Sequence, residues 1–170
     1  MIRTILTYPD PELKKKSAPV VVINDAVREL VRDMAETMYD APGVGLAAPQ
    51  VGVHQRVIVI DVSGKEEAPE LIAVINPVII HAEGDSFEEE GCLSVPQYAA
   101  NVRRHARVVV KGLDLEGNER TWRADELLAI AFQHEIDHLD GILYVDHLSP
   151  LKRDLFRRRA RRMAESGETT

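Results

Sequence analysis

Residues 134–138, His-Glu-Ile-Asp-His, place two imidazole side chains four residues apart, with a carboxylate beside the first. If this segment is helical, His134 and His138 lie one turn apart on the same face, where both can bind one metal ion. Glu135 lies about 100° around the helix axis, so it can accept a proton from a water that the metal activates. The apolar run at residues 127–132 indicates a buried helix, in which histidines need a specific partner. The pattern predicts a metal-dependent hydrolytic site; two exposed histidines beside a solvated glutamate are the simpler alternative.

A catalytic zinc or iron site normally has three protein ligands and one open position, so a third ligand is needed. A histidine at position 144 would complete one protease pattern, but the residue is Tyr144. The downstream acids that a second protease pattern requires, Glu165 and Glu168, lie in the basic C-terminal tail. The single cysteine, Cys92, carries a thiolate that suits zinc and iron(II). Taken alone, a lone cysteine is more often a small buried hydrophobic residue.

A third segment, residues 43–50, reads Gly-Val-Gly-Leu-Ala-Ala-Pro-Gln. Gly43, Val44 and Gly45 can let a ligand or a facing strand approach the backbone closely. Gln50 has an amide that can donate a hydrogen bond to a developing oxyanion. The segment alone is equally typical of a substrate-binding wall and of a turn packed into the core.

Three helices are predicted to carry or support these residues. Asn24 can cap the first, whose apolar stripe ends before the Pro-Gly pair at positions 42–43. Asp125 begins the central helix, which contains the His-Glu-Ile-Asp-His segment and ends at Gly141. The third begins near Ser149, where a capping residue precedes a proline.

Short strands occupy most of the chain between the first two helices. Residues 56–61 predict a buried strand, and residues 71–75 and 78–80 predict strand on either side of Pro77, which is expected at an edge or a break. Residues 107–111 and 119–123 predict a hairpin. Because strands and helices do not alternate, we predict an α+β fold with mostly antiparallel short strands around a central metal-binding helix, and an N-terminal and a C-terminal helix.

Length and composition are those of one globular domain, with 170 residues, 45% of them apolar and 29% charged. We expect a single catalytic domain over residues 1–170, in which residues 149–170 form a C-terminal basic helix and tail. The N-terminus has no signal-peptide pattern, and no apolar run approaches the roughly 20 residues that cross a bilayer. With its lone thiol, the chain is expected to be cytoplasmic, without a membrane partner.

The net charge of −7 is unevenly distributed. Residues 152–162 hold seven of the 21 basic residues and one of the 28 acidic ones, so the rest of the chain has a balance of −13. We expect Leu148, Leu151 and Leu155 to seat the third helix on the domain, while the arginines at 157, 158, 159, 161 and 162 point nearly all round its axis. This end is either solvated or binds a polyanion such as RNA; no DNA partner is expected of the acidic body.

Together, the three segments resemble the three motifs of the peptide deformylase family, which read GφGφAAxQ, EGCLS and HExDH, where φ is apolar. Here they are residues 43–50, residues 90–94 and residues 134–138, in the order and spacing of the family. The likeness extends from Tyr8-Pro9-Asp10 to residues 148–152 and is closest to the bacterial and organellar group that keeps EGCLS.

The resemblance implies removal of the formyl group from N-formylmethionine of nascent polypeptides, with release of formate. It implies Cys92, His134 and His138 as ligands of one divalent ion, which is Fe²⁺ in the cell and is replaced by Zn²⁺ or Ni²⁺ in purified protein. It also implies that Gln50 and the backbone N–H of Leu93 bind the formyl oxygen, and that the arginine-rich helix docks on the ribosome.

A side-chain slot is predicted beside the metal. Leu127, Ile130 and Ala131 lie seven, four and three residues before His134, so they share its helix face. With Val44 they can form an apolar slot for methionine, although the same residues can serve as core.

Two other functions fit parts of the pattern. A zinc endo- or aminopeptidase of the HExxH type would keep both histidines and Glu135 but would have no use for Cys92. A non-catalytic RNA-binding module would require a structural metal site, which is four-coordinate and closed, and the sequence offers no fourth ligand.

Overall fold

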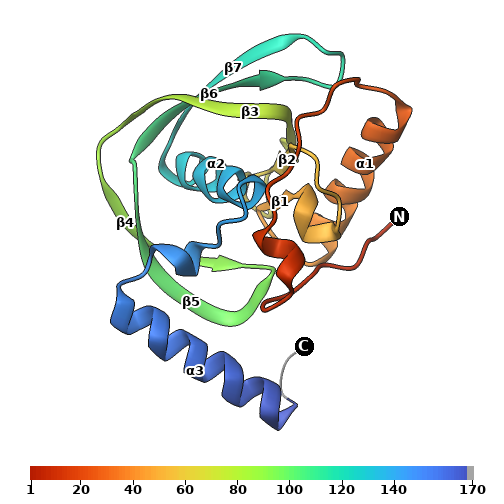
Figure 1. Cartoon of the computed structure of the whole chain (residues 1–170). Coiled ribbons are helices and arrows are strands. Elements are labelled where there is room, and N and C mark those ends of the chain that lie inside the picture. The colour runs from red at the N-terminus through yellow and green to blue at the C-terminus, as the bar shows by residue number, and fades with distance from the viewer. Residues whose placement is uncertain (168–170) are drawn as a thin grey trace.

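The central helix α2 (Glu126–Leu139) is surrounded by β-strands in the computed structural model, which describes residues 1–167. Figure 1 shows α2 in the middle of the molecule, with strands above, below and beside it. One side of α2 contributes Ala129, Phe132, Ile136 and Leu139 to the main hydrophobic core. The predicted α+β class and the central position of this helix are confirmed, while the final three residues of the expected tail lie outside the described part.

A five-stranded antiparallel sheet forms the larger layer. Its strands are β1 (Gly45–Ala47), β2 (Val57–Ile60), β3 (Ile72–Glu83), β6 (Arg107–Leu113) and β7 (Glu119–Asp125), in the order β1-β2-β3-β6-β7. On β2, Ile58 and Ile60 face the core around α2, whereas Val57 and Val59 face the core around α1. A strand covered on both faces has no polar side, which explains the continuous apolar run that predicted it.

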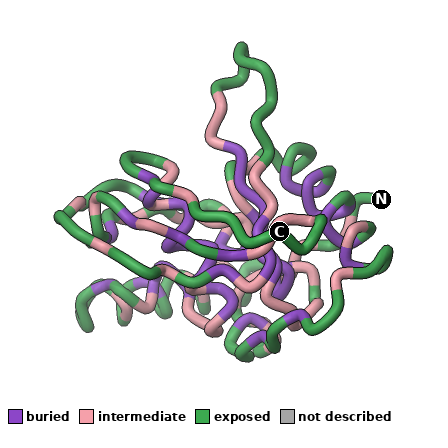
Figure 2. The backbone as a smooth tube through the Cα atoms, turned by 90° about the horizontal axis from the view of Figure 1, so that it is seen from above, coloured by how far each residue is buried: buried purple, intermediate pink, exposed green. Residues whose placement is uncertain are grey.

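Helix α1 (Asp25–Asp40) covers the other face of this sheet. The Asn24 side chain accepts a hydrogen bond from the Val27 backbone N–H at 3.1 Å, as predicted for the capping residue. The apolar stripe is buried along its length, at Val27, Leu30, Val31, Met34 and Met38. Figure 2 shows the buried segments gathered in the middle of the molecule and the exposed ones toward its periphery.

Pro77 lies within a long strand rather than at the edge of the sheet. Strand β3 runs between β2 and β6, and its register shifts between Ile75 and Val78. Asn76 has a φ of 55° at this shift. The sequence predicted the proline at an edge or at a break; the break is correct and the edge is wrong. At the bulge the pairing of the two strands is interrupted, so the missing N–H of proline removes no hydrogen bond between them.

A separate two-stranded sheet contains β4 (Ser86–Cys92) and β5 (Val95–Arg104), joined by a turn at residues 93–94. Three short 3₁₀ helices complete the connections: η1 (Pro11–Lys14), η2 (Ala48–Val51) and η3 (Tyr144–His147). The hairpin of β4 and β5 lies to the left of and below α2 in Figure 1, with β5 between α2 and the C-terminal helix.

The C-terminal helix α3 (Pro150–Ser166) begins after the Ser149 cap, as predicted, and lies on the outside of the molecule next to β5 (Figure 1). The prediction of how it is seated is wrong in part. Leu148 is buried, but Leu151 and Leu155 are 69% and 53% exposed, and Phe156 is the buried residue of the helix. Phe156 has this place because its ring packs against two tyrosines, Tyr8 and Tyr98, which sequence spacing does not reveal. No helix within residues 1–167 is long and apolar enough to span a membrane.

Candidate metal centre and active site

Cys92, His134 and His138 lie together in the structure. The cysteine Sγ and one ring nitrogen of each histidine lie within 4.8 Å of one another. The Sγ of Cys92 lies 3.3 Å from Nε2 of His138. Both histidines are buried, and the described residues contain no other cluster of this kind. One thiolate and two imidazoles are a donor set that can hold zinc or iron(II) with a coordination position open.

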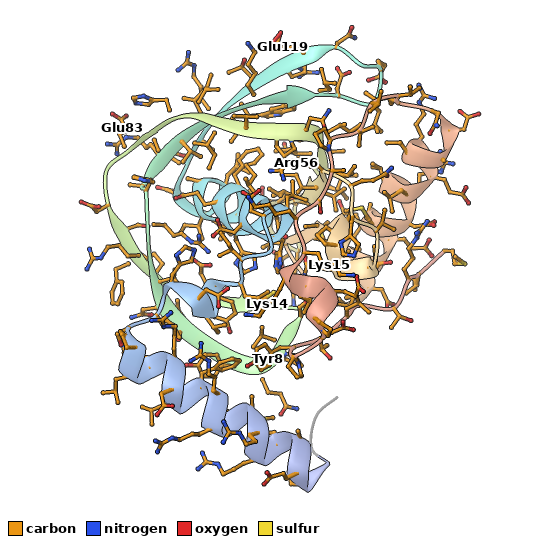
Figure 3. The ribbon with its side chains drawn as sticks, viewed as in Figure 1. Tyr8, Lys14, Lys15, Arg56, Glu83 and Glu119 are labelled. Carbon is orange, nitrogen blue, oxygen red and sulfur yellow. The ribbon has the colours of Figure 1, made fainter. Side chains whose placement is uncertain are left out.

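Two separate elements bring these groups together. His134 and His138 project from one face of α2, and Cys92 is the last residue of β4, directly before the turn to β5. Gly141, which follows α2, has a φ of 75°. A Cβ there would collide with the backbone carbonyl of Lys14, so glycine fits both the turn and the close contact. Figure 3 shows Lys14 below the end of α2.

Glu135 is buried next to the cluster but does not belong to it. Its Oε1 has no hydrogen-bond partner among the described residues, and burial raises the pKa of the carboxyl to about 7. The other oxygen lies against the backbone of Gly45, where an added Cβ would stand 2.5 Å from Oε2. A buried carboxylate oxygen without a partner is costly; a water held between it and a metal would satisfy it. The donor set and this free oxygen therefore fit a metal ion with a bound water.

Gln50 approaches the cluster from the glycine-containing segment. Its Oε1 accepts a hydrogen bond from the Ala47 backbone N–H at 2.9 Å, and its Nε2 donates to the hydroxyl of Ser94 at 3.0 Å. The same Nε2 lies 3.7 Å from Cys92 Sγ. Because Ala47 fixes the orientation of the amide, the N–H₂ group points toward the metal side. Ser94 was not predicted as a site residue. Its contact with Gln50 joins two segments that are distant in the chain, and no pattern in the sequence indicates it.

A buried ion-pair network supports the histidines. His134 donates from Nδ1 to Oε1 of Glu90 at 2.9 Å, and Arg104 donates to both oxygens of Glu90 at 2.9 and 3.0 Å. Arg104 also pairs with Asp137 at 2.6 Å, and His147 bonds the same Asp137 oxygen at 2.7 Å. Burial alone would raise the pKa of Glu90, but the bonds from His134 and Arg104 lower it. Glu90 is therefore an anion that orients the His134 ring and leaves Nε2 free for a metal.

Only part of this network was predictable from the motifs. Glu90 and Asp137 lie inside the motif segments, but Arg104 and His147 lie outside them. His147 bonds Asp137 and is not part of the metal cluster.

The charges around the two histidine rings differ. Burial lowers the pKa of His138 well below its usual value, which leaves a neutral ring with a lone pair. Burial also lowers the pKa of His134, but Glu135, Cys92 and Glu90 outweigh it and raise the pKa well above its usual value. The anionic surroundings that stabilise a proton on His134 also stabilise a metal cation.

A surface groove leads to the cluster. Its volume is about 1600 Å³, larger than the roughly 300–1000 Å³ of most small-molecule pockets and sufficient for a peptide segment. Of the predicted site residues, only His138 does not line it; those that do are Gly43, Val44, Gly45, Gln50, Cys92, Leu93, Leu127, Ile130, Ala131, His134 and Glu135. Ala131 is buried and Leu127 is half exposed, so in the predicted slot Ala131 would lie at the bottom and Leu127 at the mouth.

Comparison with known proteins agrees with this geometry. The family model described as polypeptide deformylase matches residues 2–154. The peptide deformylase of Acidobacterium capsulatum is 52% identical over 168 residues, which cover 99% of each chain. A solved peptide deformylase from Legionella pneumophila has a TM-score of 0.91 at 45% identity and covers 100% of this chain and 99% of its own. The peptide deformylase of Ehrlichia chaffeensis in complex with actinonin has a TM-score of 0.89 at 39% identity and covers 95% of this chain and 96% of its own. The chain therefore belongs to the polypeptide deformylase family.

Proposed function

We propose that Cys92, His134 and His138 hold one divalent metal ion, and that Glu135 is the base and acid in the deformylase reaction of this chain. The reaction removes the formyl group from N-formylmethionyl peptides and releases formate. The observation that carries the assignment is the three-ligand cluster at the end of a peptide-sized groove, with the partnerless oxygen of Glu135 beside it. We propose Fe²⁺ as the ion in the cell, with Zn²⁺ or Ni²⁺ in purified protein, because all three accept mixed thiolate and imidazole ligands.

The chemistry divides between the metal and the side chains. When bound, a divalent ion acts as a Lewis acid that polarises the formyl carbonyl and lowers the pKa of water. Glu135 accepts a proton from the water that attacks the formyl carbon and returns it to the amine nitrogen as the C–N bond breaks. The products are formate and a free N-terminus, so protons and electrons balance without a further reactant.

The formyl oxygen gains negative charge as the water adds. We propose that the Gln50 N–H₂ group and the backbone N–H of Leu93 donate hydrogen bonds to it. The fixed orientation of the Gln50 amide supports this role, because a donor that is already oriented needs no reorganisation during the reaction. Leu93 supports it by its position in the turn directly after Cys92.

The side chain of the first residue is proposed to enter the slot lined by Val44, Leu127, Ile130 and Ala131. The apolar walls of the slot favour methionine, because the methionine side chain is buried there away from water. We further propose that the peptide backbone passes Gly43 and Gly45, which line the groove.

The two alternative functions are not favoured. The family match covers most of the chain and does not point to an endo- or aminopeptidase. A structural zinc site would be closed by a fourth ligand, and the cluster in residues 1–167 has three members and opens into a groove.

We also propose that the whole chain, residues 1–170, is one catalytic domain that acts in the cytoplasm, where a reducing environment keeps the Cys92 thiolate available.

The arginine-rich helix α3 is proposed to bind ribosomal RNA. Five of its arginines, at positions 157, 158, 159, 161 and 162, are exposed, and one of them, Arg159, donates a hydrogen bond to the Gln97 carbonyl. The other four, at positions 157, 158, 161 and 162, are the ones proposed to contact RNA. Replacing these four with glutamine should abolish co-sedimentation with ribosomes and leave deformylation of short peptides intact. Binding by the unchanged chain should fall by orders of magnitude between ~50 and ~200 mM salt, and equal binding by the variant would refute the proposal.

The catalytic assignment is tested with protein purified without oxygen. Its metal content is measured, and formate release is followed with formyl-Met-Ala-Ser and with unformylated Met-Ala-Ser as control. We expect about one metal ion per chain and formate release in proportion to it. A fully metallated protein that releases no formate, or that hydrolyses the peptide bonds of the control, would refute the assignment.

A further inference from the structure

Residues 96–98 form a bulge in β5 directly across from the metal-binding end of β4. Gly91 pairs with Ala99, but the next pair is Cys92 with Val95, so three residues of β5 have no partner on β4. The middle residue, Gln97, has a φ of 63°, in the left-handed region that residues other than glycine rarely adopt. Bulges of this kind often lie next to active sites, where they redirect a strand.

Two side chains from outside the sheet hold this bulge. The hydroxyl of Tyr144 donates to the carbonyl oxygen of Tyr98 at 2.9 Å, and its ring stacks on His134 at 5.8 Å between centroids. From the other side, Nη2 of Arg159 donates to the carbonyl oxygen of Gln97 at 3.0 Å. The bulge is thus fixed between a residue that contacts a metal ligand and a residue of α3.

The Tyr98 ring adds to the attachment of α3. The Tyr98 centroid lies 4.8 Å from the Phe156 centroid, and the guanidinium carbon of Arg159 lies 5.6 Å from the Tyr98 centroid. Tyr8 contacts the same Phe156 ring at 5.0 Å, and Figure 3 shows Tyr8 on the side of the hairpin that faces α3. Among the arginines of α3, Arg159 is therefore engaged with the body of the protein.

The bulge also separates two hollows. Residues 95–98 line the substrate groove, and they also line a smaller cavity of about 320 Å³ next to α3. The slot for the first side chain is formed by α2 and residue 44, whereas Gln97 and Tyr98 belong to a different wall. A peptide that extends along the groove beyond the slot would pass this wall.

We infer that Arg159 is a positioning residue, which holds the bulge at residues 96–98 and thereby shapes the groove for the second and third residues of a formylated peptide. This inference rests on the proposed function. Arg159 belongs neither to the metal cluster nor to the lining of the groove, so its loss should weaken the binding of longer peptides and leave the chemical step unchanged.

The test compares Arg159→Ala with two other variants, on formyl-Met amide and on formyl-Met-Ala-Ser. Arg159→Ala should raise KM for the tripeptide by about three- to fivefold, because the lost hydrogen bond is exposed to solvent and acts on the wall of the groove, not on the peptide itself. It should leave kcat, and both constants for formyl-Met amide, within twofold of wild type. Arg159→Lys, which can still donate to the Gln97 carbonyl, should recover most of the lost affinity.

Arg158→Ala is the matched control. Arg158 is the neighbouring residue of α3, is exposed and pairs with Asp154 on the same helix, so its replacement removes the same charge without touching the bulge. Unchanged KM for the tripeptide in Arg159→Ala, equal losses on both substrates, or an equal effect of Arg158→Ala would each overturn the inference. Failure of wild-type protein to release formate would instead refute the proposed function.

Discussion

The close contact between Gly45 and Glu135 makes a sharp prediction for Gly45→Ala. The added Cβ would stand 2.5 Å from Oε2 and 2.9 Å from Cδ of Glu135, whereas ordinary van der Waals contact begins at 3.4 Å. The carboxylate must therefore retreat by about 0.9 Å. Because a misplacement of about 1 Å can cost on the order of 10²-fold in rate, we expect kcat to fall by about that factor. Metal content should stay at the wild-type level, because the cluster does not include either residue.

A double-mutant cycle separates this displacement from other effects of the substitution. In a Glu135→Ala background the carboxylate is absent and the new Cβ has room. Gly45→Ala should then have no further effect on the residual rate. Formate release and metal content are measured for the wild type, both single variants and the double variant. Gly64→Ala, in the charged loop after β2, is a control for glycine replacement as such. If the two losses simply multiply in the double variant, the proposed contact is not the cause.

Four further predictions concern the cluster and the slot. Cys92→Ala should lose metal and activity together, and a variant that keeps stoichiometric metal would exclude the thiolate as a ligand. Glu135→Gln should keep its metal and bind substrate, but its turnover should fall by about 10²–10⁴-fold or more; activity within tenfold of wild type would contradict its role. Glu90→Gln should weaken metal affinity by about 10–100-fold, measured by chelator competition, because the anionic acceptor for His134 is lost; unchanged affinity would argue against this support. Ile130→Phe should raise KM for formyl-Met peptides more than for formyl-Ala peptides, whereas equal effects would mean that Ile130 belongs only to the core.

Local sequence signals predicted the elements well where one strong cue decided each boundary. The side chains of Asn24 and Ser149 cap the first and third helices, and Gly141 follows the central one, as expected from capping chemistry. Asp125 precedes the central helix as predicted, but its side chain makes no capping hydrogen bond. The buried strand β2 and the hairpin of β6 and β7 were also predictable from composition. These features depend on neighbours in the chain, which is why the sequence alone reveals them.

Features that depend on distant neighbours were less predictable. The apolar spacing of α3 favoured Leu151 and Leu155, but both are exposed, because the surface below the helix offers aromatic partners only at Phe156. The Gln50 amide likewise donates to Ser94, which is 44 residues away in the chain. In each case the partner lies on another element, and no periodicity within one segment identifies it.

The fourth residue of the His-Glu-Ile-Asp-His segment shows why a motif can require more than its ligands. Asp137 lies on α2, one residue before the proposed ligand His138, and it pairs with Arg104 on β5. Arg104 binds Glu90 on β4, and Glu90 returns to α2 by accepting from His134. The ring of contacts thus joins the helix that carries both histidines to the hairpin that carries Cys92. Because buried charges are costly unless all of them are paired, this network favours one relative placement of helix and hairpin. The three donor atoms of the cluster depend on that placement. The thiolate lies at the end of a strand and the two imidazoles lie on a helix, so contacts within one element cannot bring them together.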